Sequence, residues 1–357
     1  MRILMIGSDE CGGGIGSHVL CLAQCLRDIA EVLVCCNGID SEFIRKCRDS
    51  GVNVIPLKAK NGHDLRVIPQ IREIINVFAP DIVHLHGIAL FIALYLKFFT
   101  MIPRICSLHT PSAKKVAWDR RILNWAVLPC YFLPVSGRTW ERFRWNYPEA
   151  RGEVFYNPIR FSECHKALHN KGASVQIVGM VGRFADQKDW KSFVTVCNIV
   201  HAKLGDKVRF LGVGVSEAEA SLALGDGAKI VDWKGVQPNG REWIGRMDVF
   251  IMTSKHEEMP TTILEAFAMK TPIAGFIPTG GVEEIVEMCH DSGLWRNDRD
   301  CEGLANDVIR LLSDVDLREK CIASANKLVH ERFDADKNCK GQLMDIYCRV
   351  AEEGAGK

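Results

Sequence analysis

The chain lacks an excess of charge of either sign. Its 357 residues include 45 Lys and Arg against 44 Asp and Glu, which gives a formal net charge of +1. A general nucleic-acid binder is normally basic over a whole domain, so we expect no nucleic-acid partner. Apolar residues make up 47% and charged residues 25% of the chain, which is ordinary for a globular protein. The length is comfortable for two domains.

The sequence also lacks the patterns of secreted and membrane-spanning proteins. The first residues, MRILMIGSDE, show no signal-peptide pattern. The 15 cysteines are scattered, without a CxxC pair or histidines at zinc-ligand spacing. We therefore expect buried, reduced thiols in a cytoplasmic protein. The longest apolar run, Ile88 to Pro103, spans only about 16 residues and contains Lys97, so we expect no transmembrane helix.

Short β-branched runs alternate with helical patterns along the whole chain, which predicts βαβ units and parallel sheets. Helical patterns lie between the runs, for example over Ser17–Ile29 and Leu65–Phe78. The expected strands are Arg2–Gly7, Glu31–Cys35, Val52–Pro56, Ile82–His86, Arg104–Leu108, Phe132–Val135, Val175–Val181, Val208–Leu211, Ile230–Trp233, Val249–Met252 and Pro272–Gly275.

A polar stretch without periodicity, residues 157–173, interrupts this pattern, after which it restarts. We therefore expect two doubly wound α/β domains, over residues 1–165 and 166–335. The tail from residue 336 to 357 has helical spacing and can pack on either domain. Ligands of such sheets bind at the carboxyl ends of strands, so the expected site is a central cleft that the two domains face.

A glycine-rich stretch, Glu10-Cys-Gly-Gly-Gly-Ile-Gly-Ser-His18, follows the first expected strand. Glycines allow backbone N–H groups to approach a phosphate or sugar, and the next helix offers its positive end. The stretch fits the dinucleotide fingerprint G-x-G-x-x-G in neither register. A plain strand-to-helix turn is the alternative interpretation.

Two basic residues, Arg183 and Lys188, follow the first strand of the second domain in the sequence VGRFADQK. An Arg fork and a Lys point charge on one loop suit a diphosphate. Basic loop residues are also common on solvated surfaces, and this alternative remains open.

The most informative stretch is SKHEEMPTTILEAFAMKTPIAGFIPTGGVEEI, residues 254–285. Pro260 fits the first turn of a helix, whose free N–H groups, with the hydroxyls of Thr261 and Thr262, can hold an anion. Glu265 lies one turn further, where a carboxylate would repel phosphate but can accept hydrogen bonds from ribose hydroxyls. Glu257 can do the same for a sugar ring. The alternative is a surface pair that caps the helix or forms salt bridges.

Taken together, these motifs resemble the retaining family 4 glycosyltransferases. EEMPTTILEAFA resembles the E-x7-E motif of that family, and GGVEEIV resembles its Gly-Gly-x-x-E segment. GRFADQK is similar to the phosphate loop, and GGGIGSHV to the N-terminal glycine loop. DIVHLHG, Ser107-Leu-His-Thr110 and Phe155-Tyr-Asn-Pro158 also occur in the family's order. The resemblance spans nearly the whole chain.

The resemblance implies a GT-B fold of two Rossmann-like domains, the first binding the acceptor and the second the nucleotide sugar. It implies that Arg183 and Lys188 hold the diphosphate and that Glu265 holds the ribose. Glu257 and the turn Glu258-Met259-Pro260 would contact the donor sugar. His109 would reach the sugar or its phosphate, although a core histidine is the alternative, and Gly13 and Gly14 would line the cleft.

One position departs from the family pattern. Glu258 stands where the family has glycine, and Met259 where it has an aromatic residue. The added bulk and charge make the donor sugar of better-known relatives an unsafe guide for this chain.

The activity implied by the resemblance is retaining transfer of a hexose from a nucleotide-diphosphate sugar, UDP-linked rather than GDP-linked, to a glycan or lipid-linked saccharide. Assembly of cell-surface polysaccharide, lipopolysaccharide or glycolipid would be its setting. The motifs that resemble the family contain no DxD pair, so we expect neither a metal nor another cofactor. The alternatives are a nucleotide-sugar epimerase on the same fold and a non-catalytic binding module.

The segment Lys97–Arg151 is locally basic and rich in tryptophan. It holds ten Lys and Arg against three acids, and four of the eight tryptophans: Trp118, Trp125, Trp140 and Trp145. This mixture suits a surface that lies on anionic lipid, which predicts a peripheral protein at the inner face of the plasma membrane. An ordinary solvated helix pair with inward-facing tryptophans is the alternative.

Overall fold

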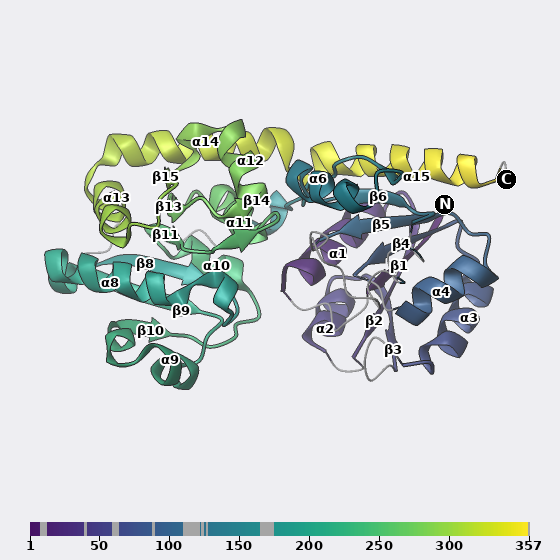
Figure 1. The fold of residues 1–357 in the computed structure, drawn as a ribbon, viewed down its shortest axis with the longest axis horizontal. Helices are drawn as coiled ribbons and strands as arrows, with labels where there is room; N and C mark the ends of the chain where they lie inside the picture. Colours follow the sequence, from purple (N-terminus) through teal and green to yellow (C-terminus); the bar gives the residue numbers. More distant parts are fainter. Residues whose placement is uncertain are drawn as a thin grey trace. The chain divides into compact units, whose positions relative to one another are not determined.

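The computed structural model describes residues 1–7, 13–38, 41–58, 64–87, 90–109, 122, 125, 128–164 and 175–355. The chain divides into two compact units, one of Met1–Pro158 with Ala335–Lys357 and one of Ile159–Asp334. Each unit is built on a parallel sheet with helices along it (Figure 1). The expectation of two doubly wound α/β domains is confirmed.

The first unit contains a seven-stranded sheet in the order β3-β2-β1-β4-β5-β6-β7. Its first six strands have the spatial order 3-2-1-4-5-6 of a Rossmann fold. Every pairing is parallel. The strands are β1 (Arg2–Gly7), β2 (Glu31–Asn37), β3 (Asn53–Leu57), β4 (Ile82–His86), β5 (Arg104–Leu108), β6 (Tyr131–Pro134) and β7 (Arg151–Gly152).

Alternation along these strands produces two hydrophobic layers, because successive strand residues point to opposite faces. Ile3 and Met5 pack in the layer that holds buried side chains of helices α1, α2 and α15. Leu4 and Ile6 pack in the opposite layer, with helices α3, α4 and α6. The helices are α1 (Gly13–Leu26), α2 (Glu42–Asp49), α3 (Val67–Phe78), α4 (Leu90–Phe99), α6 (Gly137–Asn146) and α15 (Lys340–Ala355).

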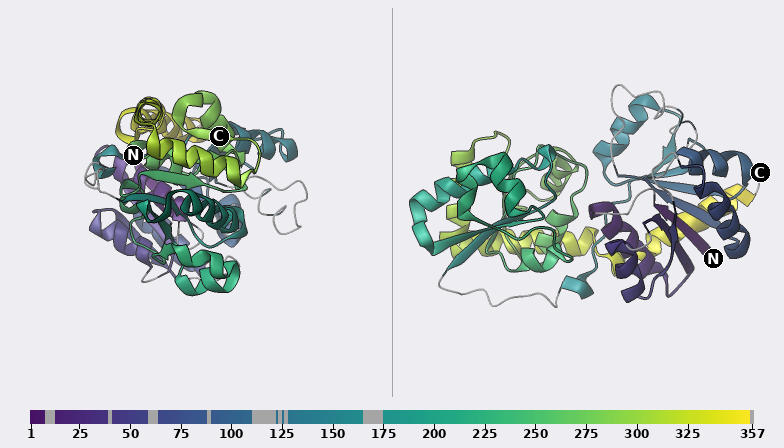
Figure 2. Two further views of the ribbon diagram at one scale, coloured as in Figure 1. Left: turned by 90° about the vertical axis from the view of Figure 1, so that its left-hand side faces the viewer. Right: turned by 90° about the horizontal axis from the view of Figure 1, so that it is seen from below.

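The C-terminal helix α15 belongs to the first unit although the second unit precedes it in the sequence. It follows a single π-helical turn at Ala335–Cys339 and lies along this unit in Figure 1 and Figure 2. One stripe of α15 is buried against the sheet: Leu343, Ile346, Tyr347 and Val350. The helix therefore completes one face of the first core.

The second unit contains a six-stranded sheet in the order β10-β9-β8-β11-β13-β15, again the Rossmann order. A separate parallel pair, β12 (His256–Glu257) with β14 (Thr279–Gly280), lies outside this sheet. The strands of the main sheet are β8 (Gln176–Val181), β9 (Val208–Val213), β10 (Val231–Trp233), β11 (Val249–Met252), β13 (Ile273–Phe276) and β15 (Leu294–Arg296).

Helices cover this second sheet as well. α8 (Trp190–Leu204) and α13 (Cys301–Ser313) pack on each other and share a core with inward-facing residues of β8, β9 and β11. α11 (Thr261–Ala268) packs against α10 (Gly240–Gly245) and α14 (Val315–Arg332). The remaining helices are α7 (Phe161–Cys164), α9 (Glu217–Leu224) and α12 (Gly281–Met288).

The observed elements differ from the expected ones at the domain boundary and in the short strands. The first unit ends at Pro158 rather than at residue 165, because Ile159 pairs with Asp334 in the second unit. The short strands β7, β12, β14 and β15 were not expected, since two or three residues carry too little alternation to be recognised. Glu10, Cys11, Gly12, Thr110, Lys114 to Arg121 and most of the polar stretch before Val175 lie outside the described residues.

The sequence predicted buried, reduced cysteines and no transmembrane helix. All 14 cysteines in the described ranges are free, and 11 of them are buried, as expected for reduced thiols. Within the described residues, no helix combines the length and the apolar character needed to cross a membrane.

The packing of α15 predicts that Leu343→Ala destabilises the first unit by about 2–5 kcal/mol, the usual cost of a buried leucine truncation. Leu343 is 1% exposed, whereas Leu222 on α9 is 91% exposed, so Leu222→Ala should change stability by less than about 0.5 kcal/mol. Urea unfolding followed by circular dichroism measures both. Equal, small effects would show that α15 does not contribute to the core.

Candidate functional site

The second unit brings two loops together at the carboxyl ends of its strands. One loop follows β8 and contains Arg183 and the single 3-10 turn Asp186–Lys188. The other follows β11 and leads through Glu257 to α11. β8 and β11 are neighbours in the sheet, and parallel neighbours end at the same edge. Residues 69 positions apart therefore meet.

Lys188 and Glu257 form the central contact between these loops. Lys188 Nζ donates to Glu257 Oε1 at 2.6 Å, and the two side chains are only 14% and 9% exposed. A buried carboxylate needs a partner because desolvation of an isolated charge is costly. The ion pair therefore holds both side chains in place, and its two charges offset each other.

Hydrogen bonds to backbone carbonyl groups hold the same two loops together. Lys255 N donates to Gln187 O at 2.8 Å, and Gln187 Nε2 donates to His256 O at 2.7 Å. Thr253 Oγ1 donates to Lys188 O at 3.0 Å. The position of Lys188 therefore does not depend on its ion pair alone.

Two glycines allow this close packing. A Cβ on Gly182 would lie 3.3 Å from the Lys188 side chain, and one on Gly280 would lie 2.1 Å from Glu257 O. Gly280 also has φ = +122°, a backbone conformation that side chains rarely adopt. The Gly-Gly pair of the sequence motif is thus explained by the approach of β14 to β12.

The predicted anion site lies at the start of α11. Pro260 is the N-cap and makes no side-chain capping hydrogen bond, and the first turn carries no acidic residue. Thr261 and Thr262 are half-buried at this end. Unsatisfied N–H groups with the positive end of the helix dipole are suited to a phosphate.

Glu265 lies one turn into α11 and has a partner that the sequence did not reveal. Arg241, in the first turn of α10, places Nη2 3.6 Å from Glu265 Oε1, and both side chains are largely buried. Arg241 follows an Asn-Gly turn in the sequence, which predicts a helix start but gives no sign of a site. The contact holds the Glu265 carboxylate in one place.

Glu258 and Met259, the two positions that depart from the family pattern, are both buried, at 7% and 4% exposed. Glu258 Oε1 lies 2.5 Å from His256 Nε2. Its carboxylate is therefore held toward His256 on the same turn. Arg183, in contrast, is exposed, although its carbonyl accepts a hydrogen bond from Trp190 Nε1 at 3.1 Å. Arg183 is near in sequence but does not join the buried pair.

In the first unit, the expected glycines begin α1. Gly13 has φ = +65°, and both Gly13 and Gly14 are exposed. The first turn of α1 carries no acidic residue. The positive end of a helix therefore lies after β1, as the glycine motif predicts.

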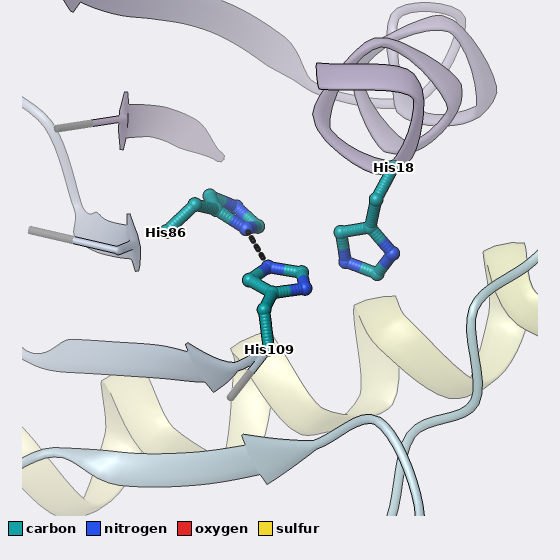
Figure 3. A group of neighbouring side chains, drawn as sticks. All are labelled: His18, His86 and His109. Carbon is teal, nitrogen blue, oxygen red and sulfur yellow. Dashed lines mark hydrogen bonds between the residues drawn. The ribbon is translucent and has the colours of Figure 1, made fainter. Parts of the chain in front are cut away.

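Three histidines gather beside this helix start (Figure 3). His18 lies on α1, His86 ends β4 and His109 follows β5. Each offers one ring nitrogen within 4.8 Å of those of the other two, and His86 Nδ1 lies 3.3 Å from His109 Nε2. Of these three histidines, the sequence motifs pointed only to His109 as a site residue. His18 and His86 stand within the quoted motifs GGGIGSHV and DIVHLHG. The adjacency of β1, β4 and β5 could have indicated that these two residues lie near His109.

A fourth histidine, His84, supports this cluster from β4. His84 Nδ1 lies 2.7 Å from the Tyr347 hydroxyl, and His84 Nε2 lies 2.9 Å from Ser107 Oγ. Its ring is 4.1 Å from that of His86, measured between centroids. Helix α15 is thereby linked to the histidine cluster through Tyr347.

Burial keeps all four histidines unprotonated at neutral pH, because desolvation disfavours the charged imidazolium. It lowers the pKa of His109 to about 4 and that of His84 to about 3, the latter with a smaller contribution from His109. It also holds the pKa of His18 and His86 well below 6.5. The cluster is therefore neutral and offers ring lone pairs.

Comparison with known proteins supplies the family. A model described as Glycosyltransferase Family 4 matches residues 12–163, and one described as Glycosyl transferases group 1 matches residues 175–314. An uncharacterized glycosyltransferase of Methanocaldococcus jannaschii is 25% identical over 97% of this chain and 96% of its own length.

Other curated relatives match over part of their length. The N,N'-diacetylbacillosaminyl-diphospho-undecaprenol alpha-1,3-N-acetylgalactosaminyltransferase of Campylobacter jejuni is 29% identical over 54% of this chain. The chain spans about half the length of this and several other relatives that it matches.

Among solved structures, Anabaena HepE in complex with UDP-glucose superimposes with a TM-score of 0.78 over 100% of both chains at 17% identity. At that identity the likeness concerns the fold. Two Rossmann-like sheets of this kind, together with family models that match both units, show that the chain belongs to glycosyltransferase family 4 and has the GT-B fold.

Proposed function

We propose that this protein is a retaining hexosyltransferase that moves a sugar from a UDP-sugar, rather than a GDP-sugar, to a glycan or lipid-linked saccharide. The observation that carries the proposal is the buried Lys188–Glu257 pair beside the uncapped start of α11. The pair offers one cation for a phosphate and one carboxylate for hydroxyls. Both come from rigid loop contacts, which is what a positioned donor requires.

The diphosphate is assigned to Lys188, Arg183 and the N–H groups at the start of α11. Negative charge builds on the nucleoside diphosphate as the sugar–oxygen bond breaks, and fixed donors and cations stabilise it. Lys188 is already desolvated, so its interaction with phosphate is stronger than in water. Arg183 is exposed and supplies its planar fork to the same oxygens. This arrangement accounts for transfer without a metal or another cofactor.

The two glutamates of the E-x7-E motif are assigned to hydroxyl groups. Glu265, held by Arg241, accepts hydrogen bonds from the ribose, and Glu257 accepts them from the donor sugar. The turn Glu258–Pro260 contacts the same sugar, and the burial of Glu258 and Met259 makes these two residues the main determinants of which sugar is accepted. In the first unit, His109, Gly13 and Gly14 are assigned to the sugar end of the donor, as the family resemblance implies.

The relatives support the choice of donor and acceptor. Anabaena HepE was solved with UDP-glucose, and the C. jejuni relative carries a diphospho-undecaprenol sugar in its name. We therefore assign this chain to the assembly of cell-surface polysaccharide, lipopolysaccharide or glycolipid, with the second unit holding the donor and the first the acceptor.

A basic aromatic surface on the first unit supports a place at the inner face of the plasma membrane. Lys97 Nζ lies 3.8 Å from the centre of the Trp125 ring, and Trp125 is 47% exposed. Other large apolar side chains of the segment are exposed too: Phe98, Phe99, Met101 and Trp145. Cationic and aromatic side chains together favour anionic lipid, so a lipid-linked acceptor is within reach of such a protein.

The assignment of Lys188 and Glu265 predicts that Lys188→Ala and Glu265→Ala each reduce transfer by about 10²–10³-fold or more, the size of effect seen when one transition-state donor is removed. Lys191→Ala, an exposed lysine three residues away, should leave transfer unchanged. Initial rates with a UDP-sugar and a saccharide acceptor measure this.

Because Lys188→Ala leaves Glu257 buried without its cation, the double variant Lys188→Ala/Glu257→Gln should recover stability but not transfer. Full activity in either single variant would refute the site assignment. Conversion of the nucleotide sugar to an epimer without acceptor would instead identify an epimerase, and binding without any reaction a non-catalytic module.

The donor preference predicts that UDP-sugars raise the melting temperature more than GDP-sugars do. A ligand present at 100 times its dissociation constant stabilises the folded state by about 2.7 kcal/mol. Differential scanning fluorimetry over a panel of nucleotide sugars measures the shift, and Glu265→Ala should reduce it for every donor. A larger shift with GDP-sugars would reverse the assignment of the base.

The basic aromatic surface predicts stronger binding to anionic than to neutral liposomes in a co-sedimentation assay. Trp125→Ser and Lys97→Glu should weaken that binding, since the first removes apolar insertion and the second reverses a charge. Leu222→Ser, at an exposed apolar position of the second unit, is the matched control. Equal binding to both lipids, or none, would exclude membrane docking through this surface.

A further inference from the structure

The four clustered histidines of the first unit differ in how their ring nitrogens are used. Both nitrogens of His84 have hydrogen-bond partners, Tyr347 and Ser107. Asn157 lies beside the His18 ring and acts to raise its pKa, but neither His18 nitrogen makes a hydrogen bond of normal geometry with the described residues, and the same holds for Nε2 of His86. His18 and His86 are each 1% exposed. A buried polar atom without a full hydrogen bond is destabilising, so these nitrogens call for an explanation.

The ring nitrogens of His18, His86 and His109 are close enough together to be ligands of one ion. Zinc binds imidazole nitrogens at about 2.0–2.1 Å, and two ligands of a tetrahedral ion then lie roughly 3.3 Å apart. His86 Nδ1 and His109 Nε2 are 3.3 Å apart and share a hydrogen bond, which an ion between the rings would replace. His18 completes the triangle within 4.8 Å, and its ring packs edge-on against that of His109 (Figure 3).

The chemistry of the ligand set selects the kind of metal. Neutral imidazole suits zinc, copper, nickel and iron, whereas calcium and magnesium require oxygen ligands. Burial keeps the three rings unprotonated, so a metal need not displace protons at neutral pH. The three-residue group contains no carboxylate or thiolate. A three-histidine zinc site leaves one tetrahedral position open.

We propose that His18, His86 and His109 form a binding site for a single divalent transition-metal ion, with Zn²⁺ as the ion it takes. Helix α1 supplies His18, and the carboxyl ends of β4 and β5 supply the other two, so three separate elements fix the site. His84, held by α15 through Tyr347, packs on His86 and supports its ring. The open fourth position is filled by water or a ligand oxygen.

A second consequence, which rests on the proposed function, is that the bound ion regulates sugar transfer. His109 is assigned to the donor sugar, and an ion that binds its ring holds that ring within the histidine cluster. Zn²⁺ and the nucleotide sugar therefore compete, and the ion inhibits transfer rather than supporting it. Addition of a chelator restores the activity.

Isothermal titration of the full chain with ZnCl₂, after treatment with a chelator, tests the site directly. We expect one ion per chain, and an intense visible spectrum of tetrahedral type when Co²⁺ replaces Zn²⁺. His18→Asn and His109→Asn should each weaken zinc binding by at least about tenfold. His290→Asn, which removes an exposed histidine of the second unit, should leave it unchanged.

Circular dichroism of each metal-free variant separates loss of the site from loss of the fold, and the half-buried His109 provides the variant that disturbs the core least. No binding by the folded wild-type chain, or equal binding by wild type and both site variants, overturns the proposal. Zinc binding by a chain that shows no glycosyl transfer even when it is free of metal leaves the site standing and refutes the proposed function instead. Zinc binding that leaves transfer at full rate overturns the inhibition alone.

Discussion

The ion pair between Lys188 and Glu257 determines how the second unit can bind anything. It joins the loop after β8 to the turn before α11, and hydrogen bonds from the Gln187 side chain and the Lys255 backbone secure the same junction. Because both charges are removed from water, neither loop can shift without leaving the other charge uncompensated. The positive start of α11 is held beside this pair, and Glu265 is held one turn further by Arg241.

The same rule of parallel strands organises both units, although the chemistry at the two edges differs. In the second unit the strand ends carry opposite charges, which suits a ligand that is anionic at one end and rich in hydroxyls at the other. In the first unit they carry uncharged imidazoles, one of them on the helix that the glycines begin. A charged group at these buried positions would be poorly solvated. Neutral rings avoid that cost and remain able to donate, accept or coordinate.

The fold was predictable from the sequence because long, periodic segments carry strong signals. β1, β4, β5 and β11 begin and end where the alternation of apolar runs indicated. The Gly-Gly pair and Pro260 were also informative, since each satisfies a backbone requirement that few other residues meet. Local chemistry of this kind can be read one motif at a time.

Contacts between distant residues were not predictable in that way. Arg241 reaches Glu265 only because α10 packs on α11, and nothing in the Asn-Gly-Arg sequence indicates it. His18 and His86 join His109 because β1, β4 and β5 are neighbours, a fact of strand order rather than of spacing. The short strand β7 and the end of the first unit at Pro158 also depend on pairing between residues that are distant in the sequence, so local patterns did not predict them.

The route of α15 has a consequence for how the chain matures. The second unit is one continuous stretch, Ile159–Asp334, whereas the first unit needs Leu343, Ile346 and Tyr347 from the far end of the chain. During synthesis the ribosome releases residues in order, so the second unit can acquire its full core while the first still lacks the side chains that α15 adds to one of its layers. The unit whose synthesis begins first is therefore completed after the second, and α15 also brings the hydroxyl that anchors His84.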